Sequence, residues 1–151
     1  MSGRIVEDEA GLAAIVRGAK TVAVIGMKSS DDAPAAAYSI PAMLRQRGYR
    51  VIPINPALSG TRIFGEPVLA GVADLSVRPD IFDVFRRSEA IPEVADEILA
   101  LPAELRAPVV WLQTGIVHHD AAERLTAAGI DVVMDRCLGV YVSRYLPHQT
   151  S

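Results

Sequence analysis

The stretch from Val22 to Ser30 reads VAVIGMKSS, and it decides the fold expected for this chain. Its first four residues are apolar and mostly β-branched, which is typical of a strand buried in a parallel sheet. The strand stops at Gly26, and backbone amides, two hydroxyls and a cation follow at Met27, Lys28, Ser29 and Ser30. Ligands of open α/β sheets bind beyond the carboxyl ends of the strands, where helix N-termini attract anions, so this composition predicts a phosphate site. The alternative is an ordinary strand-to-helix turn, because Gly26 is followed by no glycine at the positions of the dinucleotide fingerprint.

Length and composition limit the class of protein. The chain has 151 residues, half of them hydrophobic, which favours one domain with a substantial core. A net charge of −3 argues against a nucleic-acid surface. No apolar run approaches the roughly 20 residues that span a bilayer, and residues 1–10 are too acidic and polar for a signal peptide. We therefore expect a cytoplasmic protein without a membrane or nucleic-acid partner, in which the single Cys137 forms no internal disulfide.

Apolar residues recur along the chain at spacings typical of strands and helices in alternation. The predicted strands cover residues 22–25, 50–54, 80–85, 109–112 and 131–134. The predicted helices cover residues 7–19, 38–47, 89–101 and 118–128. Pro41 places the start of the second helix between Tyr38 and Ile40, since a proline is best tolerated in the first turn. Ser88 is expected to be the N-cap of the third helix.

This alternation, with short connections, predicts the α/β fold class: a Rossmann-like, doubly wound parallel sheet of about five strands in a single domain. Residues 1–20 are expected to form an N-terminal helix that braces the edge of the sheet. Residues 21–141 would form the ligand-binding domain, and residues 142–151 a C-terminal tail that is exposed or loosely docked.

Polar residues follow the second and third predicted strands. Asn55 stands where a protein that selects NAD usually carries Asp or Glu, so the amide disfavours NAD. Arg86 and Arg87 follow the third strand, and the planar fork of arginine pairs well with phosphate. They predict a second anion site. The alternative is a structural ion pair between either arginine and Asp83, Glu89 or Glu93.

The remaining strands also end in small or polar residues. Gln113, Thr114 and Gly115 follow the fourth strand, Cys137 lies after the fifth, and Tyr38 is expected beside the phosphate loop. Carboxyl ends of parallel strands meet at one edge of a sheet, so these groups are predicted to converge on one ligand.

No recognisable catalytic or metal-binding group emerges from the sequence. The adjacent pair His118 and His119 would point in different directions, without nearby Cys or carboxylate partners for a metal. An NAD(P)- or nucleotide-dependent enzyme is the alternative function, and it would need an acid or nucleophile near the strand ends. The candidates for that role are Tyr38, His118, His119, Asp135 and Cys137.

Five segments, taken in order, resemble one family. They read VAVIGMKSS, GYRVIPINP, DVFRRSE, VVWLQTGI and VVMDRCLG, and they extend over about Thr21 to Tyr141. Together they look like the small stand-alone CoA-binding proteins, whose domain is similar to the CoA-binding domain of the succinyl-CoA synthetase alpha subunit. The resemblance does not include the synthetase domain that carries the phosphorylated histidine, so ligase chemistry is not expected.

The resemblance implies coenzyme A as the ligand and assigns residues to its parts. The diphosphate would lie over Gly26, Lys28, Ser29 and Ser30. The nucleotide end would be flanked by Pro53, Asn55 and Pro56. Two further segments would border the ligand, namely Phe85, Arg86 and Arg87, and Gln113, Thr114 and Gly115. Gln113 replaces the acid of the synthetase's Thr-Glu-Gly turn, which argues against a synthetase-like partner there.

The leading hypothesis is a small CoA-binding protein without independent catalysis, which acts as a carrier, sensor or partner of a CoA-using system. A module that has lost its ligand is a further alternative. Cys137 lies where a pantetheine arm could reach, so a mixed disulfide with the CoA thiol is a hypothesis, and a buried structural cysteine is the simpler interpretation.

Overall fold

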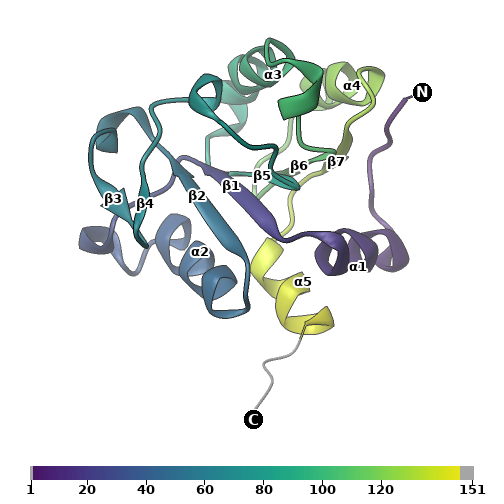
Figure 1. The fold of residues 1–151 in the computed structure, drawn as a ribbon. Coiled ribbons are helices and arrows are strands. Elements are labelled where there is room, and N and C mark those ends of the chain that lie inside the picture. Colours follow the sequence, from purple (N-terminus) through teal and green to yellow (C-terminus); the bar gives the residue numbers. More distant parts are fainter. Residues whose placement is uncertain (1, 147–151) are drawn as a thin grey trace.

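Five parallel strands form the central sheet of the computed structural model, which describes residues 2–146 (Figure 1). The strands are β1 (Thr21–Ile25), β2 (Arg50–Ile54), β5 (Ile81–Val84), β6 (Val109–Leu112) and β7 (Asp131–Val133). Their order in the sheet is β2-β1-β5-β6-β7. The helices are α1 (Glu9–Gly18), α2 (Ala36–Gln46), α3 (Ile91–Leu99), α4 (His119–Ala127) and α5 (Leu138–Tyr145). This arrangement confirms the predicted Rossmann-like fold class.

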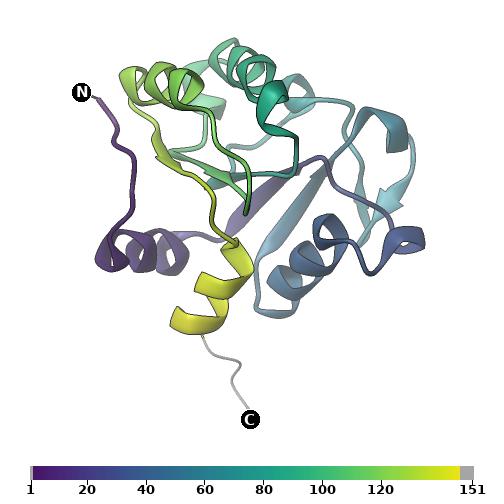
Figure 2. The same ribbon diagram turned by 180° about the vertical axis from the view of Figure 1, so that it is seen from behind.

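The helices cover both faces of the sheet, with α1, α2 and α5 on one face and α3 and α4 on the other (Figures 1 and 2). Alternate residues of β1 belong to different layers of the core. Val22 and Val24 pack with the α1, α2 and α5 layer, and Ala23 packs with the α3 and α4 layer. Both faces are apolar, which is why the strands read as continuous hydrophobic runs in the sequence.

Each edge of the sheet is completed by a single-residue bridge. Leu69 pairs in parallel with Ile54 at the end of β2. It takes the place of the third strand in the dinucleotide-binding fold, whose strands lie in the order 3-2-1-4-5-6. Ile5 pairs in parallel with Val132 of β7. The N-terminal segment therefore does cover an edge, but α1 itself packs on a face of the sheet, where Leu12 and Val16 are fully buried. The expectation that the helix itself lies against the edge is therefore wrong, because the segment before α1 covers the edge.

The second helix begins earlier than Pro41 predicted. α2 starts at Ala36, so Pro41 lies inside the helix rather than in its first turn. A proline has no N–H for the carbonyl four residues before it. That carbonyl, of Ala37, instead accepts a hydrogen bond from the backbone N–H of Lys28 at 3.1 Å. The internal proline thus ties the start of α2 to the loop after β1.

The predicted loose tail is partly wrong, because its first residues continue α5. Tyr141 and Val142 are buried, and the Tyr141 ring packs against Trp111 with a centroid separation of 5.7 Å. The expected boundary between residues 141 and 142 falls inside this helix. Residues 147–151, with His148, lie outside the described residues.

A two-stranded hairpin, β3 (Arg62–Ile63) and β4 (Glu66–Pro67), follows β2 beside α2 (Figure 1). Among residues 2–146, no helix has both the length and the apolar character needed to cross a membrane.

Candidate functional site

The candidate site lies where the chain changes direction across the sheet. From β1 the chain passes through α2 to β2 on one side, and β5 begins the run through α3, β6 and α4 on the other side. Ligands of open α/β sheets bind in the crevice at such a switch point. Gly26 ends β1 there with φ at +86°, and a Cβ at this position would lie 2.4 Å from the carbonyl oxygen of Phe85. Only glycine allows the loops after β1 and β5 to approach this closely.

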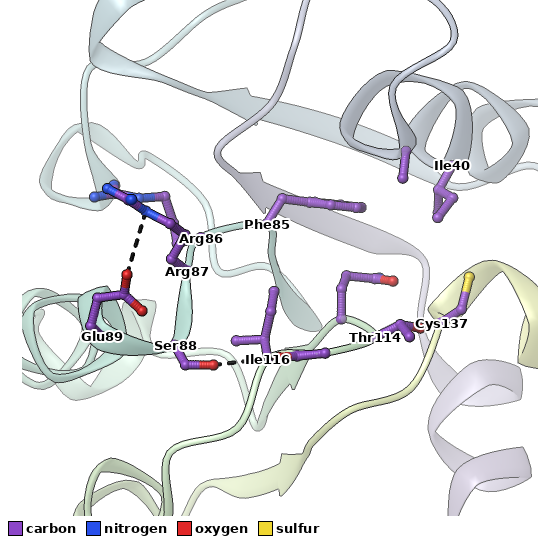
Figure 3. A pocket seen from close by; sticks show the side chains of 12 residues that line it. Ile40, Phe85, Arg86, Arg87, Ser88, Glu89, Thr114, Ile116 and Cys137 are labelled. Carbon is purple, nitrogen blue, oxygen red and sulfur yellow. Dashed lines mark hydrogen bonds and ion pairs between the residues drawn. The ribbon is translucent and has the colours of Figure 1, made fainter.

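A cavity of about 680 Å³ opens beside these loops (Figure 3). It is bordered by α2, by the loops after β5 and β6, and by the N-cap residue of α5. Seven predicted site residues line it: Phe85, Arg86, Arg87, Gln113, Thr114, Gly115 and Cys137. The sequence prediction missed five others: Ala36, Ile40, Ser88, Glu89 and Ile116. Ile40 lies in the predicted helix over residues 38–47, and nothing in the apolar spacing of that segment indicates that this side chain also faces a cavity.

A second cavity, of about 390 Å³, lies over the ends of β1 and β2. Gly26, Asn55 and Pro56 line it, as predicted for one end of a nucleotide. Phe85 and Arg86 line both this cavity and the larger one. The structure therefore brings the ends of four strands around two cavities that meet at these two residues.

The loop after β1 is less open to an anion than its sequence indicates. The backbone N–H groups of Gly26 and Met27 donate to Ile54, and that of Lys28 donates to Ala37. The Lys28 ammonium forms an exposed ion pair with Asp32 at 3.1 Å. Lys28 lines none of the described cavities. Its predicted phosphate contact would require this ion pair to open.

Ser29, Ser30 and Tyr38 line a third cavity, of about 290 Å³, against the β3-β4 hairpin. The Tyr38 ring lies 5.5 Å from the ring of Phe64, a residue whose φ of 56° is rare for a bulky side chain. These three predicted residues are therefore grouped together, in a cavity that shares no lining residue with the two larger ones.

Of the residues predicted around the end of β2, Asn55 forms hydrogen bonds within the protein and Pro53 is buried. The Asn55 Nδ2 group donates to the carbonyl oxygen of Met27 at 2.8 Å, and its Oδ1 accepts from the N–H of Ala57 at 2.9 Å. Asn55 thus joins the loops after β1 and β2 while it borders the second cavity. Pro53 is buried within β2 and lines none of the described cavities, so a direct ligand contact is not favoured.

The two arginines differ in their surroundings. Arg87 forms an exposed ion pair with Glu89 at 3.7 Å, which is one of the alternatives considered for it (Figure 3). Arg86 is exposed and has no ion pair within residues 2–146. Since Asp83 is buried in the core, it neutralises neither arginine. Arg86 is therefore the cation at the switch point that is available to an anionic ligand.

Residues from two other loops hold the backbone of Gly115. The Ser88 hydroxyl accepts from the N–H of Val117 at 3.0 Å and donates to the carbonyl of Gly115 at 3.4 Å. On the other side, the N–H of Gly115 donates to Asp135 Oδ1 at 2.6 Å. Ser88 does not act as the predicted helix cap, because a short 3-10 turn precedes α3 and its side chain reaches across to the next loop instead.

Asp83 and Gln113 form a buried pair next to the larger cavity. The Gln113 Nε2 group donates to Asp83 Oδ1 at 2.5 Å, and both side chains are almost wholly inaccessible. Burial raises the pKa of the Asp83 carboxyl to about 7, an effect that the hydrogen bond from Gln113 only partly offsets. The sequence placed Asp83 in a strand but gave no indication of this pair.

No metal site is formed by the described part of the chain, where no group of three or more His, Cys, Asp or Glu side chains is suitably placed. His118 instead caps α4, since its Nδ1 accepts from the N–H of Ala121 at 3.1 Å. Cys137 is partly exposed on the wall of the larger cavity (Figure 3).

The chain belongs to the CoA binding domain family, whose sequence profile matches residues 20–143. The uncharacterized protein YneT of Bacillus subtilis (strain 168) is 34% identical over 126 residues, which are 83% of this chain and 87% of that protein. The solved structure of cell-free ID.343 from Thermus thermophilus is 42% identical, with a TM-score of 0.84, and covers 92% of this chain and 99% of its own. A hypothetical protein from Pyrococcus horikoshii OT3 shares the fold at 22% identity, with a TM-score of 0.80 over 93% of both chains.

Family membership confirms the resemblance seen in the sequence and makes this a small protein of the CoA-binding class. The mixed disulfide between Cys137 and the CoA thiol stays a prediction. The intact mass of protein incubated with CoA disulfide, compared with that of a Cys137→Ser variant, tests it.

Proposed function

We propose that this protein binds coenzyme A across the two cavities that meet at Phe85 and Arg86, and that it acts as a carrier or sensor without catalysis of its own. The observation that carries the proposal is the position of Arg86. This cation has no ion pair within residues 2–146, and it borders both cavities at the carboxyl end of β5. A ligand with anionic groups between two larger parts would complement this arrangement.

The chemistry of CoA matches the two cavities in order. Its nucleotide end would occupy the cavity of about 390 Å³, which Asn55, Pro56 and Val72 line. Its diphosphate would lie by Gly26 and Arg86, where a bidentate guanidinium contact is favourable. Its pantetheine arm would enter the cavity of about 680 Å³, where Ile40, Phe85 and Ile116 offer apolar surface.

The surroundings of the candidate catalytic residues support binding over catalysis. His118 caps a helix, Asp135 holds the backbone of Gly115, and Tyr38 packs against Phe64 in the third cavity. A general acid or nucleophile needs a partner within hydrogen-bond reach. Cys137 has no hydrogen bond within the described residues that would activate its thiol.

Thermal unfolding with CoA, acetyl-CoA, NAD and ADP tests the proposal. A ligand that binds only the folded state stabilises it by about 2.7 kcal/mol at a hundredfold excess over Kd. We expect CoA and acetyl-CoA to raise Tm strongly and NAD to have little effect. The same Tm with millimolar CoA as without ligand would contradict the proposal, and a larger shift with NAD would favour a nucleotide-dependent enzyme.

Dephospho-CoA tests whether the ribose phosphate is recognised by a cation. It lacks the phosphate on the ribose and is otherwise identical to CoA. We expect weaker binding than for CoA, because a charge-assisted hydrogen bond is lost. Isotherms that coincide for the two ligands would show that the arginines contact only the diphosphate or nothing.

A further inference from the structure

A carboxyl group in the middle of the sheet is unusual enough to need a reason. Asp83 lies in β5 between Val24 of β1 and Trp111 of β6, and its exposed fraction is zero. Its Oδ1 accepts a hydrogen bond from Gln113, but Oδ2 is buried without a partner among residues 2–146. A buried, unpartnered carboxyl oxygen destabilises the fold. The pair therefore contributes little to stability, which points to a task at the adjoining site.

The hydrogen bond to Asp83 fixes the orientation of the Gln113 amide. An amide side chain offers donors on one side and an acceptor on the other, and Asp83 Oδ1 accepts from Nε2 whether or not the unpartnered Oδ2 carries a proton. With Nε2 committed to Asp83, the oxygen Oε1 must point elsewhere. Oε1 has no hydrogen-bond donor in the described part of the chain, yet it is not among the buried, unpartnered atoms there. It therefore keeps access to the cavity that Gln113 lines.

The surroundings make this acceptor selective. The larger cavity, which Gln113 also lines, presents the apolar side chains of Ile40, Phe85 and Ile116 (Figure 3). A hydrogen-bond acceptor on an apolar wall favours a ligand with an N–H group and disfavours one that leaves the acceptor unpaired. The pantetheine arm of CoA carries two secondary amides, each with one N–H, along an otherwise largely apolar chain.

We propose that Gln113 Oε1 accepts a hydrogen bond from an amide N–H of the pantetheine arm, and that Asp83 is a positioning residue that holds the Gln113 amide in this orientation. The inference rests on the proposed binding of CoA and deepens it. According to this inference, Asp83 and Gln113 together select a ligand whose arm carries an amide. If Asp83 were replaced by an apolar residue, the Gln113 amide would be free to turn its NH₂ group toward the cavity, which does not match an N–H of the ligand.

Titration calorimetry with two ligands tests the proposal under reducing conditions. One ligand is CoA, and the other is adenosine 3′-phosphate 5′-diphosphate, which keeps the three phosphates and lacks the arm. In Gln113→Met we expect CoA affinity to fall about tenfold while affinity for the bare nucleotide stays within about twofold. Gln46→Met, which alters an exposed glutamine at the end of α2, is the matched control and should change neither affinity.

Asp83→Leu should also weaken CoA and spare the nucleotide. Because Asp83 acts through Gln113, the double variant should bind CoA no more weakly than Gln113→Met alone. Additive losses in the double variant, or equal losses for both ligands, would overturn the role of Asp83. If Asp83→Leu does not fold, unchanged CoA affinity in Gln113→Met is sufficient to overturn the proposal. Failure of the unmodified protein to bind CoA would instead refute the proposed function, and this inference with it.

Discussion

Replacement of Asp83 by asparagine is expected to remove a pH dependence of stability that the wild-type protein carries between about pH 5 and pH 8. The pKa of this carboxyl is raised from 3.8 to about 7 in the folded state by burial. The folded protein therefore binds the proton more tightly than the unfolded chain does. The stabilisation that this provides is fully present below pH 3.8 and is lost as the pH rises toward about 7.

The magnitude follows from the two pKa values. At about 1.36 kcal/mol per pKa unit, the complete loss is roughly 4 kcal/mol. Part of it has already occurred at pH 5, so we expect the free energy of unfolding to fall by roughly 2 to 3 kcal/mol between pH 5 and pH 8 because of Asp83 alone. The asparagine side chain of the variant would be an equally buried polar group, but it does not titrate. The two proteins should therefore differ in slope, whatever their difference at pH 5.

Urea titrations followed by circular dichroism at pH 5, 6, 7 and 8 measure this slope. Asp74→Asn is the matched control, because Asp74 is an exposed residue of the same type. Its pH profile should run parallel to that of the wild-type protein. Parallel profiles for wild type and Asp83→Asn would refute the reasoning, since they would mean that Asp83 binds its proton equally tightly in the folded and unfolded states.

Three further predictions concern other parts of the site and the core. Gly26→Ala should destabilise the fold by more than about 2 kcal/mol, because the new Cβ meets the backbone of Phe85 and the residue keeps a positive φ. Gly60 also has a positive φ but lies in open space, so Gly60→Ala should destabilise the fold by only about 1 kcal/mol. Similar denaturant midpoints for these variants would contradict this. Tyr49→Phe should lose about 1 to 3 kcal/mol, since the buried hydroxyl donates to a carbonyl of α1 at 2.6 Å; an unchanged midpoint would count against that bond. Arg86→Ala should weaken CoA about tenfold or more by calorimetry, and Arg124→Ala, on the far helix α4, should not; equal affinities would remove Arg86 from the site.

Local sequence patterns were sufficient to predict the layers and the rim of the site. The β-branched run before Gly26 and the four-residue run at Val109 are buried on both faces of the sheet, so hydrophobicity alone reveals them. Because parallel strands end at one edge, the residues that follow them could be assigned to that edge without knowledge of strand order. Seven predicted site residues consequently line one cavity.

The pairings within that rim depended on contacts between segments distant in sequence. Asp83 and Gln113 are 30 residues apart, and they meet only because β5 and β6 are neighbours in a particular register. Pro41 could remain inside α2 because the N–H of Lys28 satisfies the carbonyl that the proline leaves free. Neither relation has a local signal.

Hydrophobic periodicity along a few consecutive residues was therefore sufficient to predict the five strands of the central sheet, the helices α1 to α4 and the residues at the strand ends, but it predicted neither α5 nor the β3-β4 hairpin. Tertiary contacts decide which polar atoms at those ends remain available to a ligand. That depends on which donors and acceptors neighbouring loops have already satisfied, as for Lys28 and Asn55, and on which have not, as for Arg86.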